Sequence, residues 1–259
     1  MDQTVAEFIR KNINLIDNCQ FEELQKEVEL QPFTQMQVSS IYQTLYKAGI
    51  DILPYVTRVP RYFMYRADIK NIVIPSNIEV IDQEAFAGSS LESVTISEGV
   101  RLIKDYAFNE CRNLKQLVYP NSIKACGEQQ VLPSLTEFSL PETITSKYTI
   151  LSDCENLRVV RFVGDGENTD VIEDCKHLET IEFLEGTKRA LKQWYRCNPG
   201  NKINIYLPHS CTRVDKSLCD PKYTPAKYKF YVYKDSNADI FLQHYPECEV
   251  EYRGIVTYE

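Results

Sequence analysis

The sequence lacks the features that would place it in several common classes of protein. It has no run of about 18 apolar residues, so no membrane-spanning helix is expected. Its first residues, MDQTVAEFIRKN, do not show the basic and then apolar layout of a secretory signal. A net charge of -8 argues against nucleic-acid binding, which needs a clustered basic surface. We therefore expect a cytoplasmic protein whose partners are neither nucleic acid nor membrane.

Motifs of catalysis and metal binding are also missing. The sequence contains no G-x-S-x-G elbow, no phosphate-binding loop and no G-x-G-x-x-G motif. Its nine cysteines include no C-x-x-C pair, which argues against zinc, and without a secretory leader free thiols are the default. The three histidines, His177, His209 and His244, are scattered in repeat phase, although a Cys–His pair that meets only in space stays open. We expect no enzyme, no cofactor and no metal.

What the sequence does contain is a repeat. The residues Ile69, Ile72 and Ile74 correspond in pattern to Leu91, Val94 and Ile96, and the later Ala85-Phe86 corresponds to Ala107-Phe108. Further triplets begin at Leu114, Leu135, Leu157 and Leu178, and looser ones contain Ile205 and Phe230. Subtraction of successive first positions from Ile69 to Leu178 gives steps of 21 to 23 residues. A fixed period of this length predicts a solenoid, in which each turn buries its apolar face against its neighbours.

Each repeat predicts one short strand of a parallel sheet that runs along the solenoid. Apolar strand positions should face inward and alternate with outward ones. The Ala-Phe pair is lost after Asn113, so the wall opposite the sheet should become less regular there. Cys111, Cys154 and Cys175 each lie three residues before the next leucine, which predicts a buried column of free thiols.

The first 50 residues have a different, helical pattern. Two capping boxes, Thr4 with Glu7 and Thr34 with Gln37, precede apolar residues at helical spacing, and Gly49 occupies a helix C-terminal position. We predict three helices. They form either a cap over the open end of the solenoid or a separate partner-binding module.

The repeat pattern, L-x-x-[IV]-x-[IL]-P followed by A-F-x-x-C-x-x-L, resembles the BspA-like, or Treponema-type, leucine-rich repeats. Residues 69–113 match it best, 114–183 in part and 203–245 weakly, and 230–246 resemble the family's terminal turn, a strand followed by a short helix. The resemblance implies a leucine-rich repeat solenoid over 51–259, regular at 69–113, divergent at 114–229 and ending in a capping turn at 230–259. An all-α cap would occupy 1–50. Family members are typically interaction proteins, and the helical leader resembles that of phage-encoded or cytosolic members.

The outward strand positions are the first candidate for a binding surface. They should form two files, which we name the central file and the flanking file. The central file is Val73, Thr95, Val118, Ser139, Arg161, Glu182, Tyr206 and Tyr231; the flanking file is Asn71, Ser93, Gln116, Glu137, Val159, Thr180, Asn204 and Lys229. Tyrosine and arginine often carry interface energy. Arg161, Glu182, Tyr206 and Tyr231 are therefore candidate contacts, unless the face is ordinary solvated surface.

A second candidate is the basic segment 187–196, where Lys188 and Arg189 precede Trp194, the one tryptophan. We expect a short helix here. Its Trp194 either packs on the solenoid with the charges in water, or forms an anionic or protein partner site together with Lys188 and Arg189.

The hypothesis for function is a non-catalytic scaffold that binds another protein along the sheet face. Two alternatives are a structural component of a larger, possibly phage, assembly and an inhibitor that binds a host enzyme. The sequence leaves the partner and the oligomeric state open.

Overall fold

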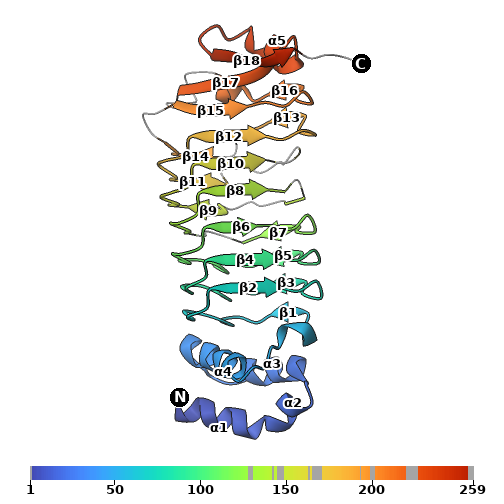
Figure 1. The fold of residues 1–259 in the computed structure, drawn as a ribbon, viewed down its shortest axis with the longest axis vertical. Coiled ribbons are helices and arrows are strands. Elements are labelled where there is room, and N and C mark those ends of the chain that lie inside the picture. The colour runs from blue at the N-terminus through green and yellow to red at the C-terminus, as the bar shows by residue number, and fades with distance from the viewer. Residues whose placement is uncertain are drawn as a thin grey trace.

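A computed structural model describes residues 2–127, 131–141, 143–144, 149–162, 164, 171–192, 194–198, 202–219 and 227–255. The molecule is an elongated stack of turns with helices at its N-terminal end (Figure 1). The fold is a solenoid with a parallel sheet along one face, as the period predicted.

The main sheet has nine strands within the described residues, and every neighbouring pair is parallel. The strands are β2 (Asn71–Ile74), β4 (Ser93–Ile96), β6 (Gln116–Val118), β8 (Glu137–Leu140), β10 (Val159–Phe162), β12 (Thr180–Phe183), β15 (Lys202–Tyr206), β17 (Lys227–Lys234) and β18 (Glu249–Ile255). The repeat phase predicted all of them except β18. Burial alternates along them as expected, with Ile72 and Ile74 buried and Asn71 and Val73 exposed.

The opposite wall is built from two-residue strands. A regular four-stranded ladder joins β1 (Arg58–Val59), β3 (Val80–Ile81), β5 (Leu102–Ile103) and β7 (Ala125–Cys126). Beyond β7 the described strands belong to other ladders, namely β9 (Leu151–Ser152), β11 (Ile172–Glu173) and β14 (Trp194–Tyr195) in one, and β13 (Arg189–Ala190) with β16 (Arg213–Val214) in another. The positions at which the ladder of β1 to β7 would continue toward β13 fall within 145–148 and 165–170, outside the described residues, so the loss of regularity after the Ala-Phe pair stays a prediction.

Stacked side chains fill the space between the two walls. The rings of Phe86 and Phe108 lie 5.3 Å apart with planes 2° apart, so equivalent positions of successive turns form a ladder. Cys111, Cys154 and Cys175 are fully buried, which confirms the predicted thiol column. Burial raises the pKa of the Cys111 thiol to about 11, so this group packs as a neutral apolar side chain.

The N-terminal segment contains four helices rather than the three that we expected: α1 (Gln3–Lys11), α2 (Ile13–Asp17), α3 (Phe21–Glu29) and α4 (Gln35–Lys47). Thr34 and Gln37 form the predicted capping box of α4, and Gly49 takes a left-handed φ of +81° after it. The prediction for α1 was wrong, because Asp2 is its N-cap and accepts a 2.8 Å hydrogen bond from the Thr4 backbone N–H. Thr4 itself lies inside the first turn of α1.

The helices α3 and α4 pack on the first turn of the solenoid. Ser39 Oγ donates a hydrogen bond to the carbonyl of Tyr65 (2.9 Å), and Gln25 Nε2 donates to the carbonyl of Arg58 (3.1 Å). The buried Tyr42 ring lies 5.4 Å from that of Phe63. These contacts cover apolar surface that the first turn would otherwise expose to water.

The C-terminal end is covered by β17, the helix α5 (Asn237–Leu242) and β18 (Figure 1). The strand followed by a short helix agrees with the expected terminal turn. Two short 3₁₀ helices, η1 (Leu53–Tyr55) and η2 (Lys216–Leu218), complete the elements. Asp239 of α5 accepts hydrogen bonds from the Asp235 backbone N–H at 2.8 Å and from the Tyr252 hydroxyl at 3.3 Å, which joins α5 to β18.

Candidate interaction surface

The strand register brings the two predicted files together on one face of the main sheet. In the central file, Val73 pairs with Thr95, Arg161 pairs with Ser139 and Glu182, and Tyr206 pairs with Glu182 and Tyr231. In the flanking file, Lys229 pairs with Asn204 on one side and with Glu249 on the other. The strand β18 therefore extends both files by one residue, to Glu251 and Glu249.

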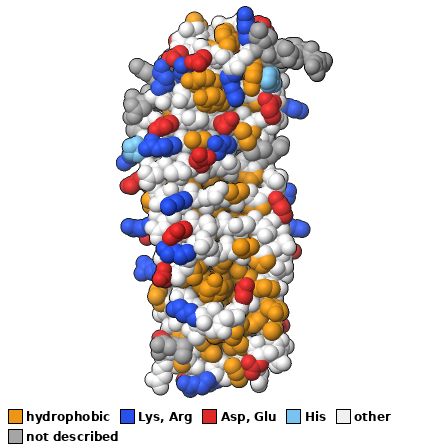
Figure 2. All heavy atoms as spheres, in the orientation of Figure 1, with side chains coloured by type: hydrophobic (Ala, Val, Ile, Leu, Met, Phe, Trp, Pro, Cys, Tyr) orange, Lys and Arg blue, Asp and Glu red, His pale blue; other side chains and the backbone are white. Residues whose placement is uncertain are grey.

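The N-terminal half of this face is apolar where it is most exposed. Val73 is 62% exposed and Val118 is 53% exposed. Hydrophobic side chains gather in the lower half of the view in Figure 2, whereas charged side chains of both signs lie close together in the upper half. The change of character along the face is the one that the sequence predicted.

Arg161 lies at the start of the charged half and contacts both of its acidic neighbours. Its Nη1 donates to Glu137 Oε2 at 2.7 Å, and its Nε donates to Glu182 Oε2 at 3.1 Å. The hydrogen bond that Arg161 donates to Glu137 and the charge of both carboxylates raise the pKa of the Arg161 guanidinium above its ordinary value. Arg161 and Glu182 are thus brought together as expected, but each already neutralises the other in part.

Tyr206 and Tyr231 stack on one another further along the central file. Their ring centroids lie 4.4 Å apart and their planes differ by 9°. Partial burial raises the pKa of the Tyr206 phenol, and the neighbouring Tyr231 raises it further. The stack fixes two large amphipathic side chains on a strand framework, where little conformational freedom is left to lose on binding.

Three residues that we did not predict extend this stack: Tyr233, His209 and Arg253. The ring of His209 lies 3.4 Å from that of Tyr233, nearly parallel to it. The guanidinium carbon of Arg253 lies 5.2 Å from the ring centroids of both Tyr206 and Tyr233. We call Tyr206, Tyr231, Tyr233, His209 and Arg253 the planar stack.

One of these residues had a signal in the sequence. Tyr233 follows Lys229 and Tyr231 at the same alternation, so the outward file could have been continued to it. Arg253 had none, because it belongs to β18, which lies outside the repeat period.

A set of alternating charges borders the planar stack. Lys229 Nζ lies 2.6 Å from Glu251 Oε2 and 3.5 Å from Glu249 Oε1, and Lys202 also pairs with Glu249. Lys229 lies over the Tyr231 ring as well, 5.2 Å from its centroid. The hydrogen bond to Glu251 raises the pKa of the Lys229 ammonium. These ion pairs are partly exposed, so they add little to the free energy of unfolding, but they orient the side chains of Lys229, Glu249 and Glu251.

The structure corrects our expectation for the basic segment 187–196. No helix forms there in the described residues, which instead contain the short strands β13 and β14. Trp194 is only 2% exposed and its indole Nε1 donates a 3.0 Å hydrogen bond to the Tyr228 hydroxyl. Its ring also stacks 6.2 Å from that of Phe162. Trp194 is therefore a core residue and does not face a partner.

The basic residues of this segment lie off the main sheet. Lys188 is exposed, and Arg189 is half-buried in β13, which pairs with β16. Arg196 Nη2 binds Glu173 at 2.8 Å and Asp174 at 2.6 Å. The strand register thus places Lys188 and Arg189 on a ladder other than the sheet that carries the tyrosines.

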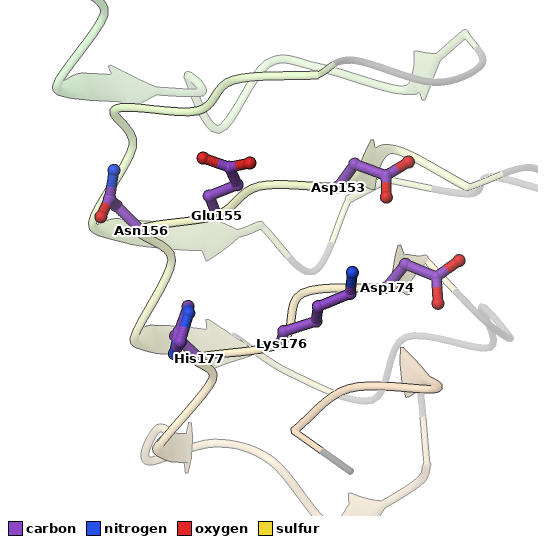
Figure 3. Close-up of a pocket in the computed structure, with 6 residues that line it drawn as sticks. All are labelled: Asp153, Glu155, Asn156, Asp174, Lys176 and His177. Carbon is purple, nitrogen blue, oxygen red and sulfur yellow. The ribbon is translucent and has the colours of Figure 1, made fainter.

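A polar hollow lies at the turns that carry residues 153–156 and 174–177. It is an open groove of about 380 Å³ lined by Asp153, Glu155, Asn156, Asp174, Lys176 and His177. Figure 3 shows them as three pairs at equivalent positions of successive turns. Within the described ranges, no cluster of three or more His, Cys, Asp or Glu side chains is arranged to hold a metal ion. The groove is a polar surface of the repeat turns.

Comparison with known proteins agrees with the repeat assignment. The family model described as the BspA type leucine rich repeat region matches residues 57–170 in six copies. The match leaves the N-terminal helices and the strands from β11 onward outside it. No curated protein matches the chain.

The solved structures that are similar to the chain include the following two. One is the pneumococcal vaccine antigen PcpA, with 15% identity and a TM-score of 0.49, over 78% of this chain and 45% of that one. The other is a leucine-rich repeat protein from Bacteroides ovatus, with 16% identity and a TM-score of 0.28, over 80% of this chain and 77% of that one. Among the described helices, none combines the length and the apolar character needed to cross a membrane.

Proposed function

We propose that the chain is a non-catalytic scaffold that binds another protein along the face of its main sheet. Leucine-rich repeat solenoids generally mediate protein–protein interactions and use extended faces for this purpose. The observation that carries the proposal is the planar stack, in which three tyrosines and an arginine lie together on one rigid face.

The composition of this half of the face is that of an interface. Tyrosine and arginine are among the residues that most often carry binding energy, and well-held aromatic side chains lose little entropy on binding. Tyr206 and Tyr231 are half-buried, so part of each ring stays accessible. The pair of Arg161 and Glu182 lies next to them in the central file and supplies polar contacts at the edge.

The test is recovery of partners from the native cell with tagged wild-type chain and with two double variants, Tyr206→Ala/Tyr231→Ala and Arg161→Ala/Glu182→Ala. We expect the tyrosine variant to lose the partner and the charge variant to retain less of it. Arg213→Ala is the matched control, because Arg213 is exposed on β16, away from the main sheet.

Equal recovery by the wild type and the tyrosine variant would contradict the proposed face. Equal loss with Arg213→Ala would show that the recovery does not depend on this face. Each variant is first shown to be folded from the fluorescence of Trp194, the one tryptophan of the chain.

A further inference from the structure

Arg253 differs from the other cations of the charged half of the sheet face. Arg161, Lys202 and Lys229 each contact at least one glutamate on the same face. Among the residues that the structure describes, Arg253 has no carboxylate partner, and its contacts are with the rings of Tyr206 and Tyr233. It is also exposed.

An irregularity in strand pairing places Arg253 at this position. The register of β17 and β18 is regular from Lys229 and Glu249 to Val232 and Tyr252, and then shifts so that Lys234 pairs with Ile255. Such a bulge inserts an extra residue into one strand, here β18, and changes the direction of the side chains there. The register shift falls at Arg253 and Gly254, and the guanidinium lies over rings from two different strands, β15 and β17.

Within the described part of the chain, the guanidinium of Arg253 lies over two rings and its N–H groups donate to no protein acceptor. Aromatic faces attract the delocalised charge without using its N–H donors, which point outward in the plane of the group. Two parallel N–H groups of an arginine match the two oxygens of a carboxylate. His209 and Tyr231 extend the aromatic surface on either side, through their stacking on Tyr233 and Tyr206.

We infer that Arg253 and the planar stack form a binding site for a carboxylate, carried by an acidic segment of a partner protein. The inference rests on the proposed function and specifies the chemistry of its partner. A single carboxylate fits the local charge, because among the described residues Arg253 is a cation without a carboxylate partner, beside lysines that glutamates already neutralise. A polyphosphate would also be repelled by Glu249 and Glu251 beside Lys229 and by Glu185, whose Oε1 lies 3.2 Å from His209 Nδ1.

The experiment uses three capped peptides that differ only in their acidic positions, which are glutamate, glutamine or phosphoserine. Binding is followed by NMR at the Nε–H resonance of Arg253 in the full chain, assigned with Arg253→Lys. We expect the glutamate peptide to shift this resonance saturably, and the glutamine peptide to bind at least about tenfold more weakly. Added salt should weaken the binding.

Two variants complete the test. Arg253→Gln lacks the Nε–H resonance, so binding to this variant is followed at the backbone amide resonances of Tyr206 and Tyr233, and we expect it to be lost. Arg112→Gln, which removes an exposed arginine from a turn in the N-terminal half, should bind the glutamate peptide as the wild type does. Equal responses to the glutamate and glutamine peptides, or no saturable response at millimolar concentration, would overturn the inference. A preference for the phosphoserine peptide would overturn the choice of carboxylate.

The results separate this inference from the proposed function. If Arg253→Gln retains the cellular partner while Tyr206→Ala/Tyr231→Ala loses it, the sheet face binds protein but the carboxylate site is wrong. If the glutamate peptide binds at Arg253 but neither variant affects partner recovery, the proposed face is wrong and the carboxylate site stands.

Discussion

The indole Nε1 of Trp194 donates a hydrogen bond of 3.0 Å to the hydroxyl of Tyr228, and both side chains are buried. The bond crosses the core from the opposite wall to the start of the main sheet's strand β17. It joins two of the divergent C-terminal turns, and it satisfies a donor that burial would otherwise leave unpaired.

Replacement of Tyr228 by Phe should therefore lower the free energy of unfolding by about 1–3 kcal/mol, because the indole N–H loses its partner inside the core. Trp194→Ala should cost about 3–5 kcal/mol through the cavity it leaves. Urea denaturation followed by circular dichroism measures both. Tyr46→Phe, at an exposed position, is the control and should change stability by less than about 0.5 kcal/mol. An unaltered stability of Tyr228→Phe would refute the structural role of the bond.

Two glycines with positive φ test the close packing of successive turns. A Cβ on Gly99 would lie 2.3 Å from the carbonyl oxygen of Ser76, whereas a Cβ on Gly186 would meet no atom within 4 Å. Gly186→Ala should cost about 1–2 kcal/mol from its backbone conformation alone. Gly99→Ala should cost about 1–3 kcal/mol more, because a backbone atom must also move. Thermal and urea denaturation of the two variants measure the difference. Equal losses of stability in Gly99→Ala and Gly186→Ala would contradict the clash at Gly99.

Glu98 makes part of the stability depend on pH. Its carboxylate accepts hydrogen bonds from the backbone N–H groups of Asn121 (3.0 Å) and Ser122 (2.9 Å) in the next turn. These hydrogen bonds hold the pKa of Glu98 below its ordinary value of 4.5. The bond from Asn121 has the largest effect, and the bonds from Ser122 add to it. A depressed folded pKa means that the stabilisation is present above the unfolded value and is lost as pH falls through the folded value.

Glu98→Gln should accordingly be less stable than the wild type at neutral pH, and the difference should shrink as the pH falls below 4.5. Melting temperatures across a pH series measure this. The control is Glu247→Gln, since the exposed Glu247 has no hydrogen-bond partner among the described residues. A difference that stays constant with pH would count against the assignment.

The thiols should react in three classes. Cys19 is exposed, Cys248 is half-buried and the other seven cysteines are buried. We expect Ellman's reagent to modify Cys19 rapidly and Cys248 slowly in the native protein, because burial raises the pKa of the Cys248 thiol. The remaining seven should react only after unfolding. Cys19→Ser removes the rapid phase, and a third reactive thiol in the native protein would contradict the burial of these seven cysteines.

The repeat period made the phase of the main sheet predictable. A turn that stacks on its neighbours must bury the same positions each time, so Ile72, Val94 and Leu117 identify the inward side and their neighbours the outward side. The central and flanking files followed from this without knowledge of the tertiary structure. Local signals were also sufficient at Thr34 and Gln37, where the capping box depends on residues three positions apart.

Prediction failed where contacts between distant residues override a local pattern. Leu191, Trp194 and Tyr195 have helical spacing, but Trp194 pairs with Ile172 in a parallel ladder, and burial of the indole stabilises that strand. Thr4 fits the sequence pattern of a capping box, but the carboxylate of Asp2 accepts the hydrogen bond from the first turn, so Asp2 is the N-cap of α1.

The sequence by itself determined the solenoid, the side of each strand that is buried and the change from an apolar to a charged and aromatic face. Periodic burial of apolar side chains is enough to specify these. Only the tertiary structure decided that Trp194 is core and that Arg253 lies over Tyr206 and Tyr233. Both depend on strand pairing between segments outside one repeat, and the register shift between β17 and β18 arises only when the two strands meet.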